Sequence, residues 1–173
     1  MARLPIIIAP DPRLKVKSEP VATVDDGLRA FMDEMLQSMY EAPGIGLSAI
    51  QVGVAKRMIV VDVSPEDRPR CPLYLVNPEI VSYSDEGSIY NEGCLSLPDH
   101  FVEIERPERI VVNFVDYGGE PQTLAADGLL SRCIQHEVDH LEGILFVDHL
   151  SAVKRNMILR KLVKARRQQA ADV

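Results

Sequence analysis

The segment that most constrains this chain is residues 135–143, Gln-His-Glu-Val-Asp-His-Leu-Glu-Gly. It places His136 and His140 four positions apart, with Glu137 directly after the first histidine. On an α-helix, residues four apart lie on the same face, so both imidazole rings can direct a nitrogen at one metal ion about 2 Å away. Glu137 lies one step around the helix and is better placed to exchange protons with water than to bind the ion. The pattern predicts a hydrolytic metal site, and the alternative is a solvated helix with incidental histidines.

A catalytic metal site of this kind needs a third protein ligand. In the metzincin pattern of metal peptidases a later histidine supplies it, but the residue at that offset is Phe146, which cannot bind metal. Cys133 lies on the same helical face, about 7 Å along the axis from a metal held by the two histidines. A cysteine side chain and a metal–sulfur bond together reach roughly 5 Å. Cys133 is therefore expected to border the site without binding the metal.

Two other cysteines are candidates for the third ligand. Cys71 precedes Pro72 and an apolar run, a setting typical of a buried, inert thiol. Cys94 lies between Gly93 and Pro98, which frame a short extended segment whose backbone another chain could approach closely. Composition and spacing therefore favour Cys94.

Three stretches of the chain resemble the signature motifs of peptide deformylases, in their usual order. They are residues 44–51 (Gly-Ile-Gly-Leu-Ser-Ala-Ile-Gln), 92–96 (Glu-Gly-Cys-Leu-Ser) and 136–140 (His-Glu-Val-Asp-His). The resemblance extends over nearly the whole chain. One departure is Ser48, which stands where the family usually has alanine; we expect it to affect local packing and not the chemistry.

The resemblance implies a metal-dependent hydrolase that removes the N-formyl group from the formylmethionine of newly synthesised polypeptides and releases formate. A divalent metal would activate water for attack on the formyl carbonyl. The implied metal ligands are Cys94, His136 and His140. The implied catalytic residues are Glu137, as general base and acid, and Gln51 and the backbone N–H of Leu95, as donors to the oxyanion.

The same resemblance implies that the peptide lies extended against the chain as an added strand, with its methionine side chain in an apolar pocket. The implied substrate-binding residues are Ile45, Gly46, Tyr90, Gly93, Leu129 and Cys133. A ligand set of one cysteine and two histidines suits zinc by its softness. The resemblance instead implies Fe²⁺, with Zn²⁺, Ni²⁺ or Co²⁺ as substitutes in purified protein, and we expect iron.

Length and composition fit such an enzyme. A chain of 173 residues, 46% hydrophobic and 26% charged, suits one globular domain. It contains no run of eighteen apolar residues, and its apolar start is too short and too rich in proline for a signal peptide. The three cysteines form no paired framework, so a reducing compartment, by default the cytoplasm, is expected.

Charge is unevenly distributed along the chain. Residues 151–173 contain seven basic residues and one acidic residue, although the net charge of the chain is −7. We expect residues 1–150 to form the catalytic domain and residues 151–173 to form a basic amphipathic C-terminal helix of the same domain. The expected apolar face of this helix consists of Val153, Met157, Leu159, Leu162 and Val163. The resemblance implies that this helix contacts the ribosome; a solvated helix without a partner is the alternative, and a membrane surface is a weaker one. We expect no DNA or membrane partner.

The remaining pattern predicts an α+β fold: antiparallel β-sheets packed around a central metal-binding helix, with an N-terminal helix and a C-terminal helix. Thr23 is expected to cap the first helix, whose methionines at helical spacing form a buried face. The metal-binding helix is expected at about 127–141, apolar nearly all round and therefore buried. Strands are expected at 58–61, 73–76, 80–83, 101–104, 110–115 and 122–125.

Two other functions remain open from the sequence. A zincin-like endopeptidase would share the His-Glu-x-x-His helix but would need a third ligand downstream, where Phe146 stands. A catalytically silent, ribosome-bound relative would keep the basic C-terminal helix, but it would have lost a metal ligand or Glu137. His100 and His149 have no partner at ligand spacing and are expected to be surface or structural residues.

Overall fold

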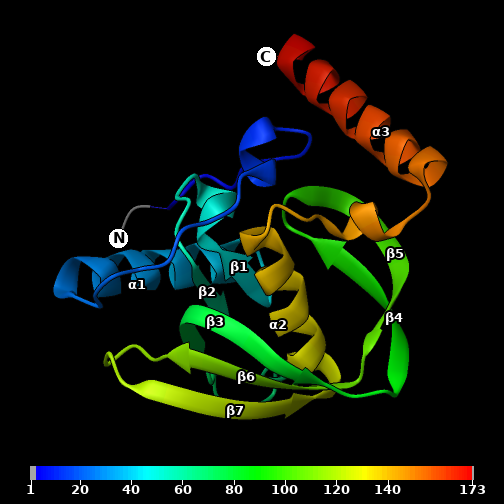
Figure 1. Ribbon diagram of the computed structural model, residues 1–173. Helices are drawn as coiled ribbons and strands as arrows, with labels where there is room; N and C mark the ends of the chain where they lie inside the picture. Colours follow the sequence, from blue (N-terminus) through cyan, green and yellow to red (C-terminus); the bar gives the residue numbers. More distant parts are fainter. Residues whose placement is uncertain (1–2, 173) are drawn as a thin grey trace.

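Helix α2 (Gly128–Leu141), which carries the His-Glu-x-x-His segment, lies at the centre of the molecule between a large sheet and a separate hairpin (Figure 1). The computed structural model describes residues 3–172. Within that part of the chain, α2 contacts strands of the large sheet, and its residues from Ser131 to Glu137 are buried. The expected α+β architecture around a central helix is confirmed.

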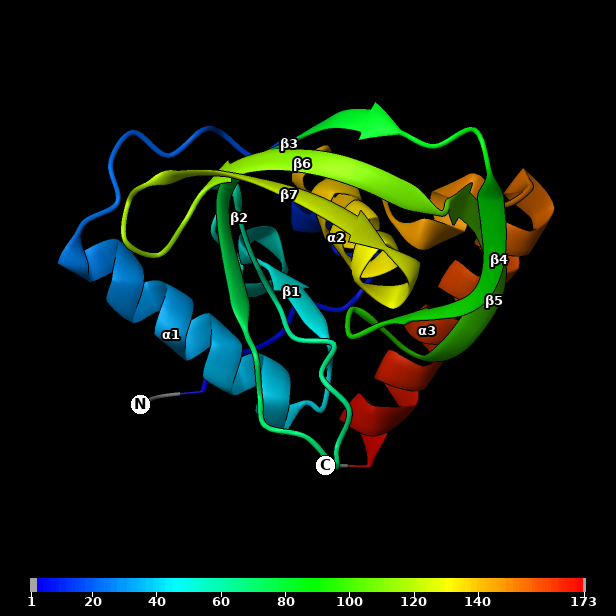
Figure 2. The same cartoon turned by 90° about the horizontal axis from the view of Figure 1, so that it is seen from below.

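The large sheet has five antiparallel strands in the order β1-β2-β3-β6-β7. Their bounds are β1 (Gly46–Ser48), β2 (Met58–Val61), β3 (Leu73–Tyr83), β6 (Arg109–Val115) and β7 (Pro121–Asp127). Figure 2 shows the sheet curving around α2, with α1 on the other side of its short strands. Helix α2 is thus enclosed on its apolar side, which explains the burial of both its histidines.

Strands β4 (Gly87–Cys94) and β5 (Leu97–Pro107) form a second, two-stranded sheet. The pairing is regular until Gly93, which lies opposite Phe101, and then shifts so that Cys94 lies opposite Leu97. The residues between Leu97 and Phe101 form a bulge that contains Asp99, whose φ is 66°. A bulge bends a strand and redirects its side chains. Here it lies beside Cys94, at the end of β4 nearest α2.

Helix α1 (Asp26–Glu41) begins two residues later than the sequence suggested. Asp25, not Thr23, is its N-cap: the Asp25 carboxylate accepts a hydrogen bond of 2.8 Å from the backbone N–H of Leu28. An aspartate at the cap also interacts favourably with the helix dipole, which accounts for the shift. The predicted methionine face is confirmed, because Met32, Met35 and Met39 are fully buried.

Some strand predictions were incomplete. The expected strands 73–76 and 80–83 are one strand, β3, interrupted by two register shifts where it pairs with β6. Strands β1 and β4 were not predicted as strands, because both contain glycine and few β-branched residues. Their pairing is set by tertiary contacts, which local sequence preference does not report.

Helix α3 (Ala152–Ala171) follows a short 3₁₀ turn, η3 (Phe146–His149), and extends along the edge of the molecule (Figure 1). Its predicted apolar face was partly wrong. Leu162 is buried and Leu159 packs on the core, but Val153 and Met157 are 73% and 49% exposed. Ile158 contributes to the packed side in their place.

Two glycines lie at the ends of α2: Gly128 is its first residue, and Gly143 follows it. They differ in how closely other atoms approach them. Both have positive φ, 75° and 54°. A Cβ on Gly143 would lie 2.4 Å from the carbonyl oxygen of Lys15, whereas one on Gly128 would meet no atom within 4 Å.

We predict that Gly143→Ala lowers the free energy of unfolding by about 3 kcal/mol, because backbone strain and a clash act together. Gly128→Ala should cost only the strain, about 1 kcal/mol. Urea denaturation of both variants measures the difference. Equal losses would contradict a clash at Lys15.

Candidate active site

Three metal-binding side chains meet where the end of β4 approaches the face of α2. The ligand atoms of Cys94, His136 and His140 all lie within 4.8 Å of one another. The sulfur of Cys94 is 3.4 Å from Nε2 of His140. Both histidines are buried and Cys94 is partly buried. The structure thus brings together the three residues that the sequence singled out as ligands.

The two histidines of the cluster have different surroundings. Nδ1 of His136 donates to Oε1 of Glu92 over 2.9 Å, which leaves Nε2 of that ring for an ion. Burial lowers the pKa of His140 well below its usual range, so this ring is neutral. A neutral imidazole is the form that binds a metal.

Glu92 anchors a network of buried charges behind the ligands. Its carboxylate accepts hydrogen bonds of 2.6 and 3.0 Å from Arg106 on β5, and it also pairs with Arg132 on α2. Arg106 in turn donates to Asp139 over 2.9 Å. Burial alone would raise the pKa of Glu92, but the bonds from His136 and Arg106 outweigh it and lower this pKa to about 2.

Sequence analysis missed the partners in this network. Glu92 belongs to a recognised motif, but it was given no role of its own, and Arg106, Arg132 and Asp139 were not singled out. One available signal was spacing, since Arg132 precedes His136 by four positions and therefore shares its helical face. The contribution of β5 could not be found this way, because it depends on the pairing of β4 with β5.

Cys94, His136 and His140 are called the ligand cluster below. Glu137 lies beside this cluster, and its side chain is buried. Its Oε2 atom has no hydrogen-bond partner among the described residues. Burial raises the pKa of Glu137 to about 7. Gly46 makes room for it, because a Cβ there would lie 2.8 Å from Oε1 of Glu137 and 2.7 Å from the sulfur of Cys133. A carboxyl group in this position can accept and return a proton.

The donor set fits a divalent metal. One thiol and two imidazoles match the ligand number of catalytic metal sites, which keep a further position open for water. Beside this donor set, Oε2 of Glu137 is buried without a hydrogen-bond partner in residues 3–172. Buried polar atoms without partners are costly and are often satisfied by an ion or water.

Gln51 and Leu95 flank the ligand cluster. Nε2 of Gln51 lies 3.6 Å from the sulfur of Cys94, so the amide nitrogen faces the ligands. Both neighbouring loops are held by the N-terminal segment: the backbone N–H of Ile7 donates to Gln51 O over 2.7 Å, and that of Ala9 donates to Ser96 O over 2.8 Å. This N-terminal strap, residues 7–9, fixes the two loops relative to each other.

A cleft of about 740 Å³ opens above the ligand cluster. Three of its apolar side chains, those of Ile45, Tyr90 and Leu129, are exposed to solvent. Exposed apolar side chains gathered in one concave surface are typical of a binding site. The cleft is lined by all six residues expected to bind substrate, namely Ile45, Gly46, Tyr90, Gly93, Leu129 and Cys133.

Other predictions about candidate residues had mixed outcomes. Phe146 is buried and its ring stacks on that of His136, with centroids 6.1 Å apart. His149 contacts Asp139 and is partly exposed, as expected for a structural or surface residue. The expectation that Cys71 is buried was wrong: it is exposed, because it lies in the loop before β3 and the apolar run begins only after it.

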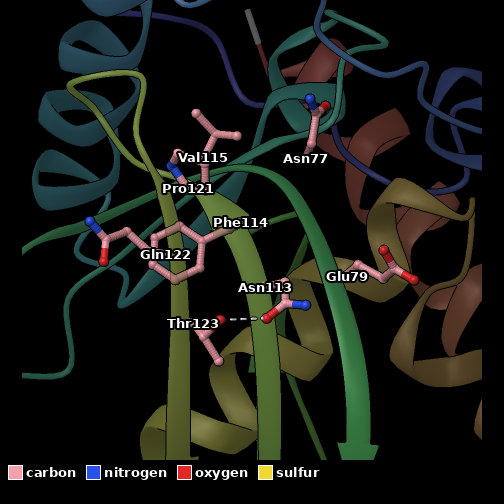
Figure 3. A pocket seen from close by; sticks show the side chains of 8 residues that line it. All are labelled: Asn77, Glu79, Asn113, Phe114, Val115, Pro121, Gln122 and Thr123. Atoms are coloured by element: carbon pink, nitrogen blue, oxygen red, sulfur yellow. Dashed lines mark hydrogen bonds between the residues drawn. The ribbon is translucent and has the colours of Figure 1, made fainter.

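A second hollow lies at the end of the large sheet, away from the ligand cluster. Figure 3 shows its lining side chains, which come mainly from β3, β6 and β7. One hydrogen bond crosses it, from the hydroxyl of Thr123 to the side-chain oxygen of Asn113 over 2.7 Å. Its lining contains no cysteine or histidine, so it offers no set comparable to that around Cys94.

Comparison with known proteins shows the family of this chain. Residues 3–156 match the family model described as polypeptide deformylase. The chain belongs to the peptide deformylase family. A curated peptide deformylase from Brucella suis is 51% identical over 171 residues, covering 99% of this chain and 98% of the relative. One from Rhizobium meliloti is 50% identical over 167 residues, covering 96% of each chain.

Solved peptide deformylases share the fold as well. The crystal structure of the enzyme from Ehrlichia chaffeensis has a TM-score of 0.93 and 40% sequence identity, and it covers 98% of this chain and 99% of its own. A structure of the Ehrlichia enzyme in complex with actinonin has a TM-score of 0.91, 42% identity and coverage of 95% and 98%. This chain is thus an enzyme of the deformylase family. Within residues 3–172, no helix has the length and apolarity needed to cross a membrane.

The buried network of this deformylase leads to a stability prediction. Glu92→Gln keeps the shape of the side chain, but it leaves the buried Arg132 without a counter-charge and Arg106 with only Asp139. We expect the free energy of unfolding to fall by about 3–5 kcal/mol, as measured by urea denaturation.

Glu86→Gln is the matched control, since Glu86 forms an exposed ion pair of 2.9 Å with Arg109. It should cost less than about 1 kcal/mol. If both variants lowered the free energy of unfolding by similar amounts, burial would not explain the contribution of the Glu92 network to stability.

Proposed function

We propose that this chain removes the N-formyl group from the N-terminal formylmethionine of newly synthesised polypeptides and releases formate. Membership of the peptide deformylase family supports this reaction. The observation that carries the proposal is the convergence of Cys94, His136 and His140 beside the buried carboxyl of Glu137, at the floor of an open cleft. That arrangement suits attack by water on an amide held in the cleft.

In this proposal Cys94, His136 and His140 hold a divalent metal, which supplies Lewis acidity to water and to the formyl carbonyl. Glu137 takes a proton from the attacking water and returns it to the departing amino group. The unpartnered oxygen of Glu137 and its burial support this role, because no other described side chain competes for that oxygen. Formate and a free amino terminus are the products.

Two donors serve the oxyanion that develops on the formyl oxygen. The amide nitrogen of Gln51 faces the cysteine ligand, and the backbone of Leu95 lies directly after it on the chain. Both belong to loops held by the N-terminal strap. Donors that are fixed before the reaction stabilise developing charge without a cost of reorganisation.

The peptide is proposed to lie extended along the edges formed by residues 45–46 and 93–95, with its methionine side chain among Ile45, Tyr90, Leu129 and Cys133. Backbone pairing of this kind gives affinity for many sequences, while one apolar pocket gives selectivity at the first residue. The exposure of Ile45, Tyr90 and Leu129 supports this placement, since the incoming side chain would cover them. These four residues come from three separate parts of the chain.

The proposed metal is Fe²⁺, with Zn²⁺, Ni²⁺ or Co²⁺ as substitutes, and the proposed location is the cytoplasm. The proposed further partner is the ribosome surface, through α3. The basic residues of α3 are mostly exposed, so a large part of its charge is available to an anionic surface. Its partial packing through Leu159 and Leu162 holds it against the catalytic domain.

The role of Glu137 is tested by replacing it. We expect Glu137→Ala to lower formate release from a short formylmethionyl peptide by at least about 100-fold, because it removes the group that moves the proton. Bound metal, measured by elemental analysis, should stay at the wild-type level. Glu66→Ala, in the exposed loop before β3, is the control and should retain activity. Internal cleavage of the peptide without formate release would instead support an endopeptidase.

Metal dependence is tested by removal and restoration. Chelator treatment should abolish formate release, and anaerobic addition of Fe²⁺ should restore it. Cys94→Ser should reduce metal content by roughly 10-fold or more at limiting metal, because it replaces the soft sulfur ligand. Cys71→Ser, which changes an exposed thiol, should leave metal content unchanged. Full activity of metal-free protein would contradict the proposal.

Ribosome binding is tested by charge reversal on α3. The double variant Lys161→Glu, Lys164→Glu should reduce co-sedimentation with ribosomes several-fold at low salt, because it reverses two exposed charges. Formate release from a short peptide should be unchanged. The control variant Lys17→Glu, Lys56→Glu has the same change in net charge elsewhere on the surface. Equal loss of binding in both variants would contradict a specific role for α3.

A further inference from the structure

Ser48, at the end of β1, makes a contact that local packing does not explain. Its hydroxyl group donates to Oε1 of Gln51 over 3.0 Å, and its backbone N–H donates to the same oxygen over 2.9 Å. Ser48 is fully buried and Gln51 is 1% exposed. We had expected this departure from the family's usual alanine to matter only for packing, yet its hydroxyl binds a candidate catalytic side chain.

Both ends of the Gln51 amide make hydrogen bonds. Oε1 accepts the two hydrogen bonds from Ser48, one for each of its lone pairs. On the other side, Nε2 has two hydrogens and two acceptors: the hydroxyl of Ser96 at 3.0 Å and the sulfur of Cys94 at 3.6 Å. Rotating the amide by half a turn would set its nitrogen against the backbone N–H of Ser48, which can only donate, and would remove the N–H that points at the sulfur of Cys94. The amide therefore has one favourable orientation.

The hydroxyl of Ser48 affects the Gln51 amide in two ways. It fills a buried acceptor site that alanine would leave with only the backbone N–H, and unsatisfied buried acceptors are costly. It also withdraws electron density from Oε1, which makes the hydrogens on Nε2 better donors. Both effects act on the atom that faces Cys94 and the proposed position of the formyl oxygen.

We propose that Ser48 is a positioning residue for the reaction: its hydroxyl fixes and polarises the Gln51 amide, so that the Nε2 hydrogen directed toward Cys94, and not the one bonded to Ser96, is presented to the oxyanion. This inference rests on the proposed function, since it assigns Ser48 to the donor side of that reaction. Ser48 touches neither the substrate nor the ligand cluster in this assignment and acts only through Gln51.

The test compares Ser48→Ala, which removes the hydroxyl, with Ser48→Cys, which fills the same space with a slightly larger group but offers only a weak donor. Ser38→Ala is the matched control, because Ser38 is a fully buried serine on α1 whose hydroxyl accepts from the backbone N–H of Leu4. Each folded variant is measured in two ways. Hydrogen exchange of the Gln51 side-chain amide is followed by NMR in metal-free protein, and kcat and KM are measured with iron-loaded protein.

Both Ser48 variants should exchange the Gln51 amide hydrogens about fivefold faster than wild type, since one net hydrogen bond corresponds to roughly that factor. Their kcat should fall about three- to tenfold with KM within about twofold, as for an interaction made only in the transition state. Ser38→Ala should change neither. If Ser48→Ala does not fold, Ser48→Cys still provides the comparison.

Unchanged exchange and unchanged kcat in the Ser48 variants would overturn the inference. So would wild-type behaviour of Ser48→Cys alongside a defective Ser48→Ala, because volume rather than the hydroxyl would then be responsible. The exchange measurement does not depend on activity. Absence of formate release by the iron-loaded wild type would therefore refute the proposed function separately from the positioning of Gln51.

Discussion

The carboxylate of Glu92 is the interaction on which the rest of the site depends. It lies on β4 and binds Arg106 from β5 together with Arg132 and His136 from α2. Burying charges is unfavourable unless they are paired with good geometry, so these ion pairs favour the observed arrangement of β4, β5 and α2. Cys94 follows Glu92 by two residues on the same strand. The network therefore sets the distance between Cys94 and the helix that carries the histidines.

This dependence explains why a hairpin separate from the main sheet can supply a ligand with defined geometry. Two-stranded hairpins are marginally stable alone. Here the hairpin is joined to α2 by buried ion pairs on one side, and its Ser96 carbonyl accepts a bond from the N-terminal strap on the other. The bulge after Leu97 then turns the end of β4 toward the histidines. Rigidity at Cys94 thus comes from its surroundings and not from the hairpin itself.

The parts of the site that could be predicted from sequence were those with local geometry. His136 and His140 share a helical face at fixed spacing, and Met32, Met35 and Met39 form a buried stripe by the same rule. Arg106 and the strands β1 and β4 escaped prediction because their roles depend on pairing between distant segments. The exposure of Cys71 and Val153 was not predicted, because a residue next to an apolar stretch of the sequence need not pack against it in the folded structure.

The N-terminal strap also affects the order in which the site can be assembled. Ala9 bonds to Ser96, and Cys94 meets a histidine 46 residues later in the chain. Contacts between such distant segments require large loops to close, which slows folding. A fragment that ends before residue 140 contains the strap, the amide of Gln51 and the cysteine, but not the complete ligand set. During synthesis, the N-terminal strap is therefore made first, but its contacts can contribute to a complete site only after α2 has been made.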